Sequence, residues 1–469
     1  MRAVRDVLAR PSGTVRTCVL LGLLAVSGAA ILELVREETG TPGFFVGLGL
    51  ALLPVPVLMA AFRWLGRVTP GPWPYLLYAF GWGACAAALI AILANSFATE
   101  WIAGATADPS DADQLGSIAI APVVEESAKA AALLLVFLFR RQRLCGIADG
   151  IVLAGFTATG FAFTENILYL GNAFGEDLGS GIGVLDSLTA ATFFVRIMLS
   201  PFAHPLFTVL TGIGFGAAAL CARRPGRVVL PLSGLTLAMG VHALWNSSSE
   251  LGEYGFYVVY GSVMVPAFGL LVWLALWTRR RRLRTLGSEL AVYAAAGWLA
   301  PAEVPALASM PARSLARVLA RNAGGRTAGR VVAAYQADAA ELALLRHRAR
   351  RGGPAGVPEF VERERELLDR MWLYRPVAGP VLVRAAVLEE LVPAPSAPSG
   401  QSAQAGAAAR RLLPGPRPVP AAAVPLARPP ALPVVLPVAR RSGPWTPART
   451  ADPSSSPRPC ALPGADGPR

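Results

Sequence analysis

Three charged residues lie close together within an apolar stretch, Ala121-Pro-Val-Val-Glu125-Glu126-Ser-Ala-Lys129. Charged side chains inside an apolar helix are costly, so each of them requires a partner or a function. Glu125 and Lys129 are four residues apart and would share one helix face, whereas Glu126 would lie about 100° around the helix. Lys129 can therefore hold one carboxylate while the other points into the protein. Adjacent carboxylates in a low dielectric suit a general base or a proton carrier. The structural alternative is a buried ion pair, which needs only one glutamate.

Further polar residues in apolar stretches could complete a reactive site. They are Glu165, Asn166, His204, His242 and Asn246, and Arg196 is the remaining charge in these stretches. His242 and Asn246 are four residues apart and share one helix face, while His204 lies between two prolines that would disturb its helix and admit water. Taken singly, each of them is more readily explained by an interhelical hydrogen bond. Together, they supply the carboxylates, imidazoles and amides that can activate a water and stabilise an oxyanion.

The composition indicates that membrane-spanning helices position these residues. Of the 469 residues, 54% are hydrophobic and 16% are charged, and the mean hydropathy is +0.48. A soluble protein has about a quarter of its residues charged. Because a backbone in hydrocarbon must satisfy its own hydrogen bonds, the spans are helices, and the predicted fold class is an all-α polytopic membrane helix bundle. The net charge is +13, and the positive side chains are almost all arginines, since Lys129 is the one lysine. We interpret this charge as membrane topology and tail composition, and predict no nucleic-acid partner.

Eight stretches reach the length of about 17–25 residues that a membrane span requires. They are residues 17–35, 43–62, 75–97, 117–139, 147–170, 188–221, 228–247 and 256–278. The sixth is the longest and contains Pro201 and Pro205. Proline removes a backbone hydrogen bond and clashes with the preceding turn, so this span is predicted to be kinked or broken.

The arginines set the orientation of the predicted helices. They gather in every second loop, at residues 1–16, 63–67, 140–143, 223–227 and 279–282. Arginine-rich loops stay in the cytoplasm, so both termini are predicted to be cytoplasmic. The start of the chain also resembles a signal peptide, but its apolar stretch continues past the small residues to Val35. Counted from the outer helix ends, Glu125 would lie about 12 Å deep, and Glu165 and His242 about 8 Å deep.

These patterns divide the chain into four parts. Residues 1–16 form a basic cytoplasmic N-terminus and residues 17–278 an eight-helix core. Residues 279–392 mix leucine, alanine, arginine and glutamate with helical spacing, which predicts a small helical cytoplasmic region. Residues 393–469 are rich in proline, alanine and arginine and are predicted to be a disordered tail.

Several other membrane chemistries are not supported by motifs. The sequence lacks the H-E-x-x-H zinc motif, the G-x-S-G of rhomboid-type serine proteases and the G-x-G-D of presenilin-type aspartic proteases. A proton-coupled transporter remains an alternative, because buried glutamate, lysine and histidine can form a proton path. However, the polar residues all fall in spans four to seven, and we find no inverted repeat. A catalytically silent membrane scaffold is the third alternative.

Four motifs resemble those of the PrsW family of bacterial intramembrane proteases. Glu125-Glu126-Ser-Ala-Lys129 resembles the E-E-x-x-K motif of that family. Phe161-Ala-Phe-Thr-Glu165-Asn166 resembles its second motif, His204 with the following glycines its third, and His242-Ala-Leu-Trp245-Asn246 its fourth. They occur in the family's order within residues 117–247, whereas the first spans and the residues after 285 carry none of them. The family is similar in turn to the membrane glutamic proteases that include the CAAX prenyl endopeptidases and the Abi proteins.

The resemblance implies an intramembrane endopeptidase of the bacterial plasma membrane. Its substrate would be a membrane-anchored protein, such as an anti-sigma factor, cut toward the extracytoplasmic side. By the same resemblance, Glu125 or Glu126 would polarise the attacking water. His204 would orient that water or hold Glu165, while His242 and Asn246 would face the oxyanion. Lys129 and Asn166 belong to the same motifs and complete the predicted catalytic set.

The resemblance leaves the role of a metal open. Names in this family often include the word metalloprotease, and His204, His242 and Glu165 could bind zinc. Metal-free general-base catalysis is the favoured alternative, because no compact zinc-ligand spacing is present. The predicted cofactor is therefore none, with zinc as the alternative.

Overall fold

The fold is described from a computed structural model of the chain. It describes residues 13–106, 114–181, 187–221, 223–252, 254–350 and 357–391, all of which belong to one compact unit. Every regular element in these ranges is helical, so the predicted all-α class is confirmed. The basic N-terminus up to residue 12 and the predicted disordered tail at 393–469 lie outside the described residues.

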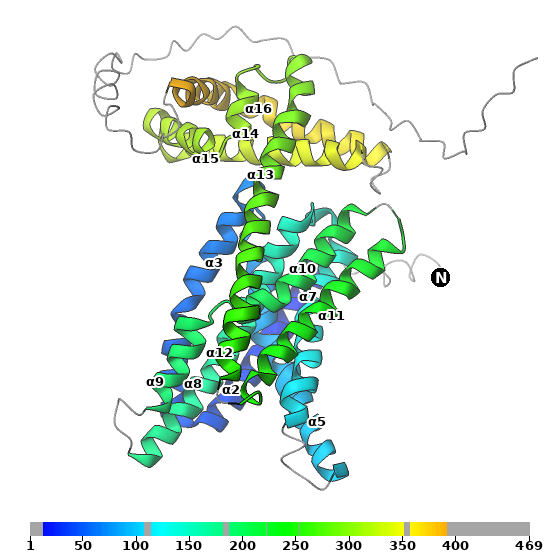
Figure 1. Cartoon of the computed structure of the whole chain (residues 1–469). Helices are drawn as coiled ribbons and strands as arrows, with labels where there is room; N and C mark the ends of the chain where they lie inside the picture. The colour runs from blue at the N-terminus through cyan, green and yellow to red at the C-terminus, as the bar shows by residue number, and fades with distance from the viewer. Residues whose placement is uncertain are drawn as a thin grey trace, which may run out of the picture. The chain divides into compact units, whose positions relative to one another are not determined.

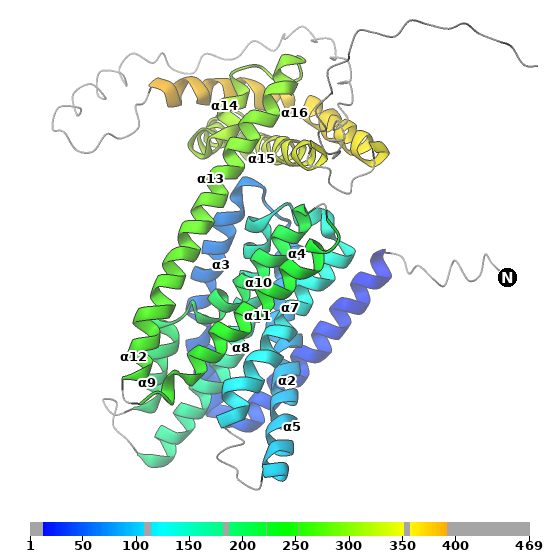
Figure 2. The ribbon, with the colours of Figure 1, turned by 45° about the vertical axis from the view of Figure 1, so that its right-hand side comes forward.

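The helices form a bundle followed by a second group of C-terminal helices (Figures 1 and 2). The first part of the bundle contains α2 (Gly13–Leu52), α3 (Pro54–Leu65), α4 (Trp73–Gly81), α5 (Ala88–Thr106), α7 (Ala121–Phe139) and α8 (Ile147–Ser180). The second part contains α9 (Leu188–Phe193), α10 (Ala203–Leu220), α11 (Gly226–Asn246), α12 (Gly255–Val259) and α13 (Val265–Ala295). Four π-helical turns interrupt or join these helices: η2 (Trp82–Ala87), η3 (Gly116–Ile120), η6 (Phe194–Leu199) and η8 (Tyr260–Met264).

Six helices of the described residues are long and apolar enough to cross a membrane. They are Thr17–Val68, Trp73–Gly104, Ile147–Ser180, Leu188–Leu220, Gly226–Ser249 and Gly255–Ala295. The membrane bundle is thus confirmed, but the count of eight is not. The predicted spans 17–35 and 43–62 both fall in the segment Thr17–Val68, within which two helices meet at a kink at Gly40, a residue with the non-helical φ of +68°. The predicted span 117–139 is helical, but the three charges on α7 set it apart from the apolar helices.

Helix α8 lies at the centre of the bundle. It packs against α2, α3, α4, α7, α9 and α10, and 83% of its most apolar stretch is buried. Its glycines lie where neighbouring backbones approach most closely. A Cβ atom at Gly150 would lie 1.9 Å from the Gly212 carbonyl oxygen on α10, and one at Gly160 would lie 2.0 Å from the Phe80 carbonyl oxygen on α4. Small residues at such crossings allow close helix packing, and this packing brings Glu165 of α8 near His204 of α10.

Replacing Gly150 by alanine is expected to destabilise the protein by about 1–3 kcal/mol, because the added Cβ would overlap a backbone oxygen that cannot move independently. Thermal unfolding of the purified protein in detergent measures this effect. The matched control is Gly240→Ala on α11, where a Cβ meets nothing within 4 Å. That change is expected to be neutral or stabilising, since alanine favours a helix over glycine. Equal melting temperatures for the two variants would contradict the close packing of α8 on α10.

The predicted break in the sixth span is confirmed. Helix α9 continues into η6, and the chain leaves the helix after Leu199 before α10 begins at Ala203. The Ser200 hydroxyl donates a hydrogen bond of 2.6 Å to the Val195 carbonyl oxygen near the start of η6. Pro205 lies in the first turn of α10, where a missing N–H group has no consequence. The break therefore places His204 at the start of a helix, inside the bundle.

The C-terminal helices have an apolar core of their own. They are α14 (Glu303–Ala308), α15 (Met310–Arg350) and α16 (Val357–Leu391). Helix α13 runs without a break through residue 279, where the sequence predicts a domain boundary, and contributes Leu286 and Tyr293 to this core. The buried Tyr335 hydroxyl donates to Glu303 at 2.5 Å, and burial together with this carboxylate raises the pKa of Tyr335.

Candidate active site

Lys129 is the centre of a buried polar cluster. Its side chain is fully buried, and its Nζ atom lies 2.9 Å from Glu126 Oε1 and 3.2 Å from Glu125 Oε2. The same Nζ atom lies 3.3 Å from His204 Nδ1 and 3.7 Å from the centre of the Phe161 ring. An ammonium group has three protons to donate, and here the two carboxylates and the imidazole surround it. One lysine therefore neutralises part of the charge of both glutamates, which the sequence had assigned to different environments.

Both carboxylate oxygens of Glu126 have polar partners. It is 0% exposed, and its Oε2 accepts a hydrogen bond of 2.9 Å from the Thr208 hydroxyl on α10. Its Oε1 lies 3.3 Å from His242 Nδ1 on α11. Three helices thus meet at this carboxylate, because α7 supplies the acid while α10 and α11 supply its partners. Breaking any of these contacts would leave a buried charge without a partner, which is strongly unfavourable.

A second group of charges adjoins the first through His204. Glu165 Oε2 lies 2.5 Å from His204 Nε2 and 2.8 Å from a terminal nitrogen of Arg196. Arg196 Nε donates to Asn166 Oδ1 at 2.8 Å, and its guanidinium lies 3.8 Å from the centre of the Tyr169 ring. Arg196 thereby fixes both polar residues of the second motif, Glu165 and Asn166.

The two contacts of His204 determine which ring nitrogen carries the proton. Nδ1 faces the ammonium of Lys129, which can only donate, so Nδ1 accepts. Nε2 therefore carries the hydrogen and faces Glu165 Oε2. His204 thus lies in close contact with both Lys129 and Glu165. The charged residues and imidazoles joined by these contacts form the charged cluster: Glu125, Glu126, Lys129, Glu165, Arg196, His204 and His242.

A cavity of about 220 Å³ opens beside the cluster. Its walls are contributed by α8, η6, α10, α11 and the turns next to them, and of the residues predicted from sequence they include Asn166, His204 and Asn246. Arg196 also lines it, next to Ser200 and Pro201 of the helix break. The cavity therefore meets the cluster at His204 and Arg196, while Glu126 and Lys129 lie behind them.

The structure brings most of the predicted site residues together but gives Asn246 a different environment. The Asn246 side-chain nitrogen donates to the Ser117 carbonyl oxygen at 2.8 Å, which joins α11 to η3. Sequence reasoning did not include Arg196 and Thr208 in the site. Arg196 was recognisable as a charge within an apolar stretch, and Thr208 as a hydroxyl four residues after His204 on the same helix face.

Three donors of the cluster could hold a metal ion. One ligand atom from each of Glu125, His204 and His242 lies within 4.8 Å of the other two. Two imidazoles and one carboxylate are a donor set found in catalytic zinc sites. Carboxylates also contact both histidines from behind, as the outer partners of metal-binding histidines do. The donor chemistry therefore fits zinc, with Glu125 in the position that the sequence gave to Glu165.

Residues 71–271 match the model of a family described as PrsW family intramembrane metalloprotease. No curated protein and no solved structure matches the chain. The matched segment contains the whole charged cluster and all four motifs noted in the sequence, so the resemblance to this family is confirmed. Over these residues, the membrane bundle is similar to the PrsW family of intramembrane metalloproteases.

Proposed function

We propose that the protein is an endopeptidase that hydrolyses membrane-anchored proteins with Glu125 as the general base. The observation that carries this proposal is the buried cluster of three carboxylates, two cations and two imidazoles beside a cavity. A group of this kind can take a proton from water and return it to a leaving amine. A transport path would need the same residues, but the family match favours proteolysis.

The two adjacent glutamates have different roles in this proposal. Glu126 is fully buried, and its oxygens are occupied by Lys129, His242 and Thr208. Glu125 is 7% exposed; its close contact is with Lys129 Nζ at 3.2 Å, while His242 Nε2 lies 3.9 Å away. A general base must reach the proton that it removes, and Glu125 has more freedom to do so. Glu126 is then a positioning residue that orients Lys129 and His242.

His242 is proposed as the general acid. Its two ring nitrogens face two carboxylates, Nδ1 toward Glu126 at 3.3 Å and Nε2 toward Glu125 at 3.9 Å. An imidazolium ion has two protons and satisfies both directions. With neutral imidazoles the cluster would hold three carboxylates and two cations, so a proton on His242 also removes the excess buried charge. After Glu125 takes a proton from water, His242 gives one to the departing amine.

The substrate is proposed to enter through the cavity next to His204. An α-helix keeps its carbonyl groups in internal hydrogen bonds, so the cleaved segment must be extended where it reaches the site. Arg196 and Asn166 line this cavity and can stabilise the developing oxyanion, since Asn246 is engaged with Ser117. The cluster lies far along α8 from the arginine-rich loops, which favours cleavage toward the extracytoplasmic side of a substrate such as an anti-sigma factor.

Chelation separates the two catalytic alternatives. A zinc ion bound by Glu125, His204 and His242 would supply Lewis acidity toward water and the peptide carbonyl. We favour the metal-free route, because the ammonium of Lys129 already lies 3.2–3.3 Å from two of these three donors. Cleavage is therefore expected to survive 1,10-phenanthroline with less than about a twofold change. Loss of cleavage that zinc restores, with one zinc per chain by elemental analysis, would assign the site to a metalloprotease.

The proposed function is tested by reconstituting the full chain in vesicles with a panel of single-span membrane proteins. Appearance of two fragments of a panel member, with a cleavage position mapped by mass spectrometry near one membrane face, is the expected result. The Glu125→Gln variant provides the matched inactive protein. Absence of cleavage for the whole panel, together with proton flux into the vesicles that requires Glu125, would contradict the proposal and support transport.

A further inference from the structure

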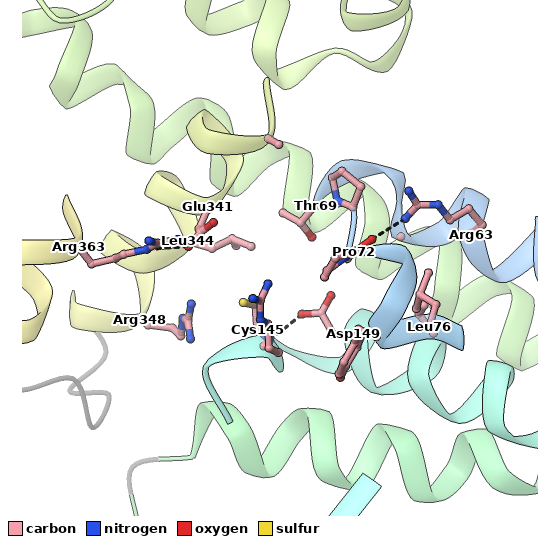
Figure 3. A pocket seen from close by; sticks show the side chains of 17 residues that line it. Arg63, Thr69, Pro72, Leu76, Cys145, Asp149, Glu341, Leu344, Arg348 and Arg363 are labelled. Carbon is pink, nitrogen blue, oxygen red and sulfur yellow. Dashed lines mark hydrogen bonds and ion pairs between the residues drawn. The ribbon is translucent and has the colours of Figure 1, made fainter. Parts of the chain in front are cut away.

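A second, larger cavity lies at the other end of the bundle. It has a volume of about 350 Å³ and is lined by three parts of the chain (Figure 3). The connection from α3 to α4 supplies residues 69–72, the connection from α7 to α8 supplies Cys145, and α15 and α16 supply Glu341 and Arg363. Asp149, which also lines it, is sixteen residues before Glu165, or about 24 Å along α8. This cavity is therefore separate from the charged cluster.

The lining of this cavity is predominantly positive. It contains four arginines and two carboxylates: Arg63, Arg143, Arg348, Arg363, Asp149 and Glu341. Both carboxylates already have a guanidinium partner. Asp149 binds Arg282 with contacts of 2.6 and 2.7 Å, and Glu341 binds Arg363 at 2.5 Å. Figure 3 shows Glu341 and Arg363 on one side of the cavity and Asp149 on the other, with Cys145 between them. The negative side chains therefore leave part of the positive charge of the wall uncompensated.

Arg63 and Arg143 supply that uncompensated charge. Arg63 donates to the Gly71 carbonyl oxygen at 3.0 Å and lies 4.9 Å from the centre of the Trp73 ring, so its guanidinium is held in place without a carboxylate from the described ranges. The exposed guanidinium of Arg143 makes no ion pair with any residue that the structure describes. Guanidinium groups bind phosphate oxygens in pairs, and two of them here face one cavity.

Tyr75 provides an independent indication of a ligand. It lines the cavity, and its hydroxyl is buried and has no hydrogen-bond partner within the described part of the chain. Buried polar groups are almost always hydrogen-bonded, so an orphan group calls for a partner. A phosphate oxygen would accept from this hydroxyl. The volume of the cavity is also at the lower end of the range for small-molecule sites.

We propose that this cavity binds a phosphate-bearing anion, contacted by Arg63, Arg143 and Tyr75. The ligand would lie between the bundle, which supplies these three contacts, and helices α15 and α16, which supply another part of the wall. A ligand that binds the folded protein in this way stabilises it. The same phosphate chemistry is present in anionic lipid headgroups and in soluble phosphate esters, so the experiment uses one probe of each source.

The test uses the purified full chain and does not depend on proteolysis. Glycerol 3-phosphate is titrated calorimetrically into the protein in detergent, and binding of phosphatidylglycerol is compared with binding of phosphatidylcholine by native mass spectrometry in the same detergent. Saturable binding of at least one anionic probe, with a rise in melting temperature, is expected. Binding of glycerol 3-phosphate would indicate a soluble ligand, and binding of phosphatidylglycerol alone would indicate a lipid.

Two variants and one control locate the binding. Arg143→Gln and Tyr75→Phe are each expected to weaken binding about tenfold, as loss of a charge-assisted or buried hydrogen bond does. Tyr75→Phe removes a hydroxyl that has no partner among the described residues, so the ligand-free melting temperature should not fall. Arg223→Gln changes an exposed arginine of another arginine-rich loop outside the cavity and should leave affinity unchanged. No saturable binding of either probe, or equal affinities for all variants, would overturn the proposal.

Discussion

Replacing Glu125 by glutamine is expected to lower the rate of substrate cleavage by about 10²–10⁴-fold, which is the contribution of a general base. Glutamine keeps the size and hydrogen-bonding shape of the side chain but cannot take a proton from water. Because Lys129 would retain Glu126 as a charged partner at 2.9 Å, the folded structure should persist. The measurement is the single-turnover cleavage rate in vesicles, together with the melting temperature of the same preparation.

The controls for this variant separate chemistry from packing. Glu33→Gln changes an exposed glutamate that pairs with Arg36, and it should leave the cleavage rate unchanged. Glu126→Gln should lower both the rate and the melting temperature, because Glu126 holds contacts from three helices. A Glu125→Gln protein that cleaves at the wild-type rate would rule out Glu125 as the base. If Glu126→Gln alone were inactive and fully stable, the two roles would have to be exchanged.

Replacing Lys129 by methionine is expected to be the most destabilising single change in the bundle, by about 3–5 kcal/mol. Methionine matches the length of the lysine stem but removes the charge that both Glu125 and Glu126 contact. Glu125 and Glu126 would then share His242 as a cationic partner, and the loss of one buried cation leaves excess negative charge, which is strongly unfavourable. The double variant Lys129→Met/Glu126→Gln should recover part of the loss, because it leaves one carboxylate fewer.

The sequence itself offers a direct test of the burial of Lys129 and of its dependence on Glu126. Lys129 is the one lysine of the chain, and in the folded protein its side chain is 0% exposed. An amine-reactive reagent should therefore modify Lys129 of the wild type in proportion to the unfolded fraction. The Glu126→Gln variant should be modified at lower denaturant concentration than the wild type. Rapid modification of Lys129 in the native wild type would contradict its burial, and an unchanged melting temperature of Lys129→Met would show that the carboxylates do not need it.

The sequence alone was sufficient for the fold class and for most residues of the charged cluster. Long apolar stretches must be helices in a bilayer, because the backbone has no other hydrogen-bond partner there. Charges within such stretches are so unfavourable that the few present, Glu125, Glu126, Lys129, Arg196 and Glu165, had to meet one another. The two prolines on either side of His204 likewise predicted the helix break. These conclusions follow from the composition and residue spacing of individual chain segments.

The count of membrane helices depended on features that hydropathy does not contain. Two predicted spans lie in one segment, Thr17–Val68, and are separated within it by a kink at Gly40, whose φ is positive. The three charges on α7 make it more polar than the six apolar helices, although it packs against α5, α8, α10 and α11. Hydropathy measures the average cost of insertion, whereas the environment of α7 is created by neighbouring helices.

The tertiary structure alone decided which partner each polar residue has. Helical spacing allowed Lys129 to pair with one glutamate, but its Nζ atom contacts both of them and His204. Spacing placed Asn246 on the same face as His242, yet its amide binds the Ser117 carbonyl oxygen. The physical reason is that hydrogen bonds between helices depend on the rotation and depth of each helix. Those are set by close contacts such as that of Gly150 with Gly212, which no single stretch of sequence specifies.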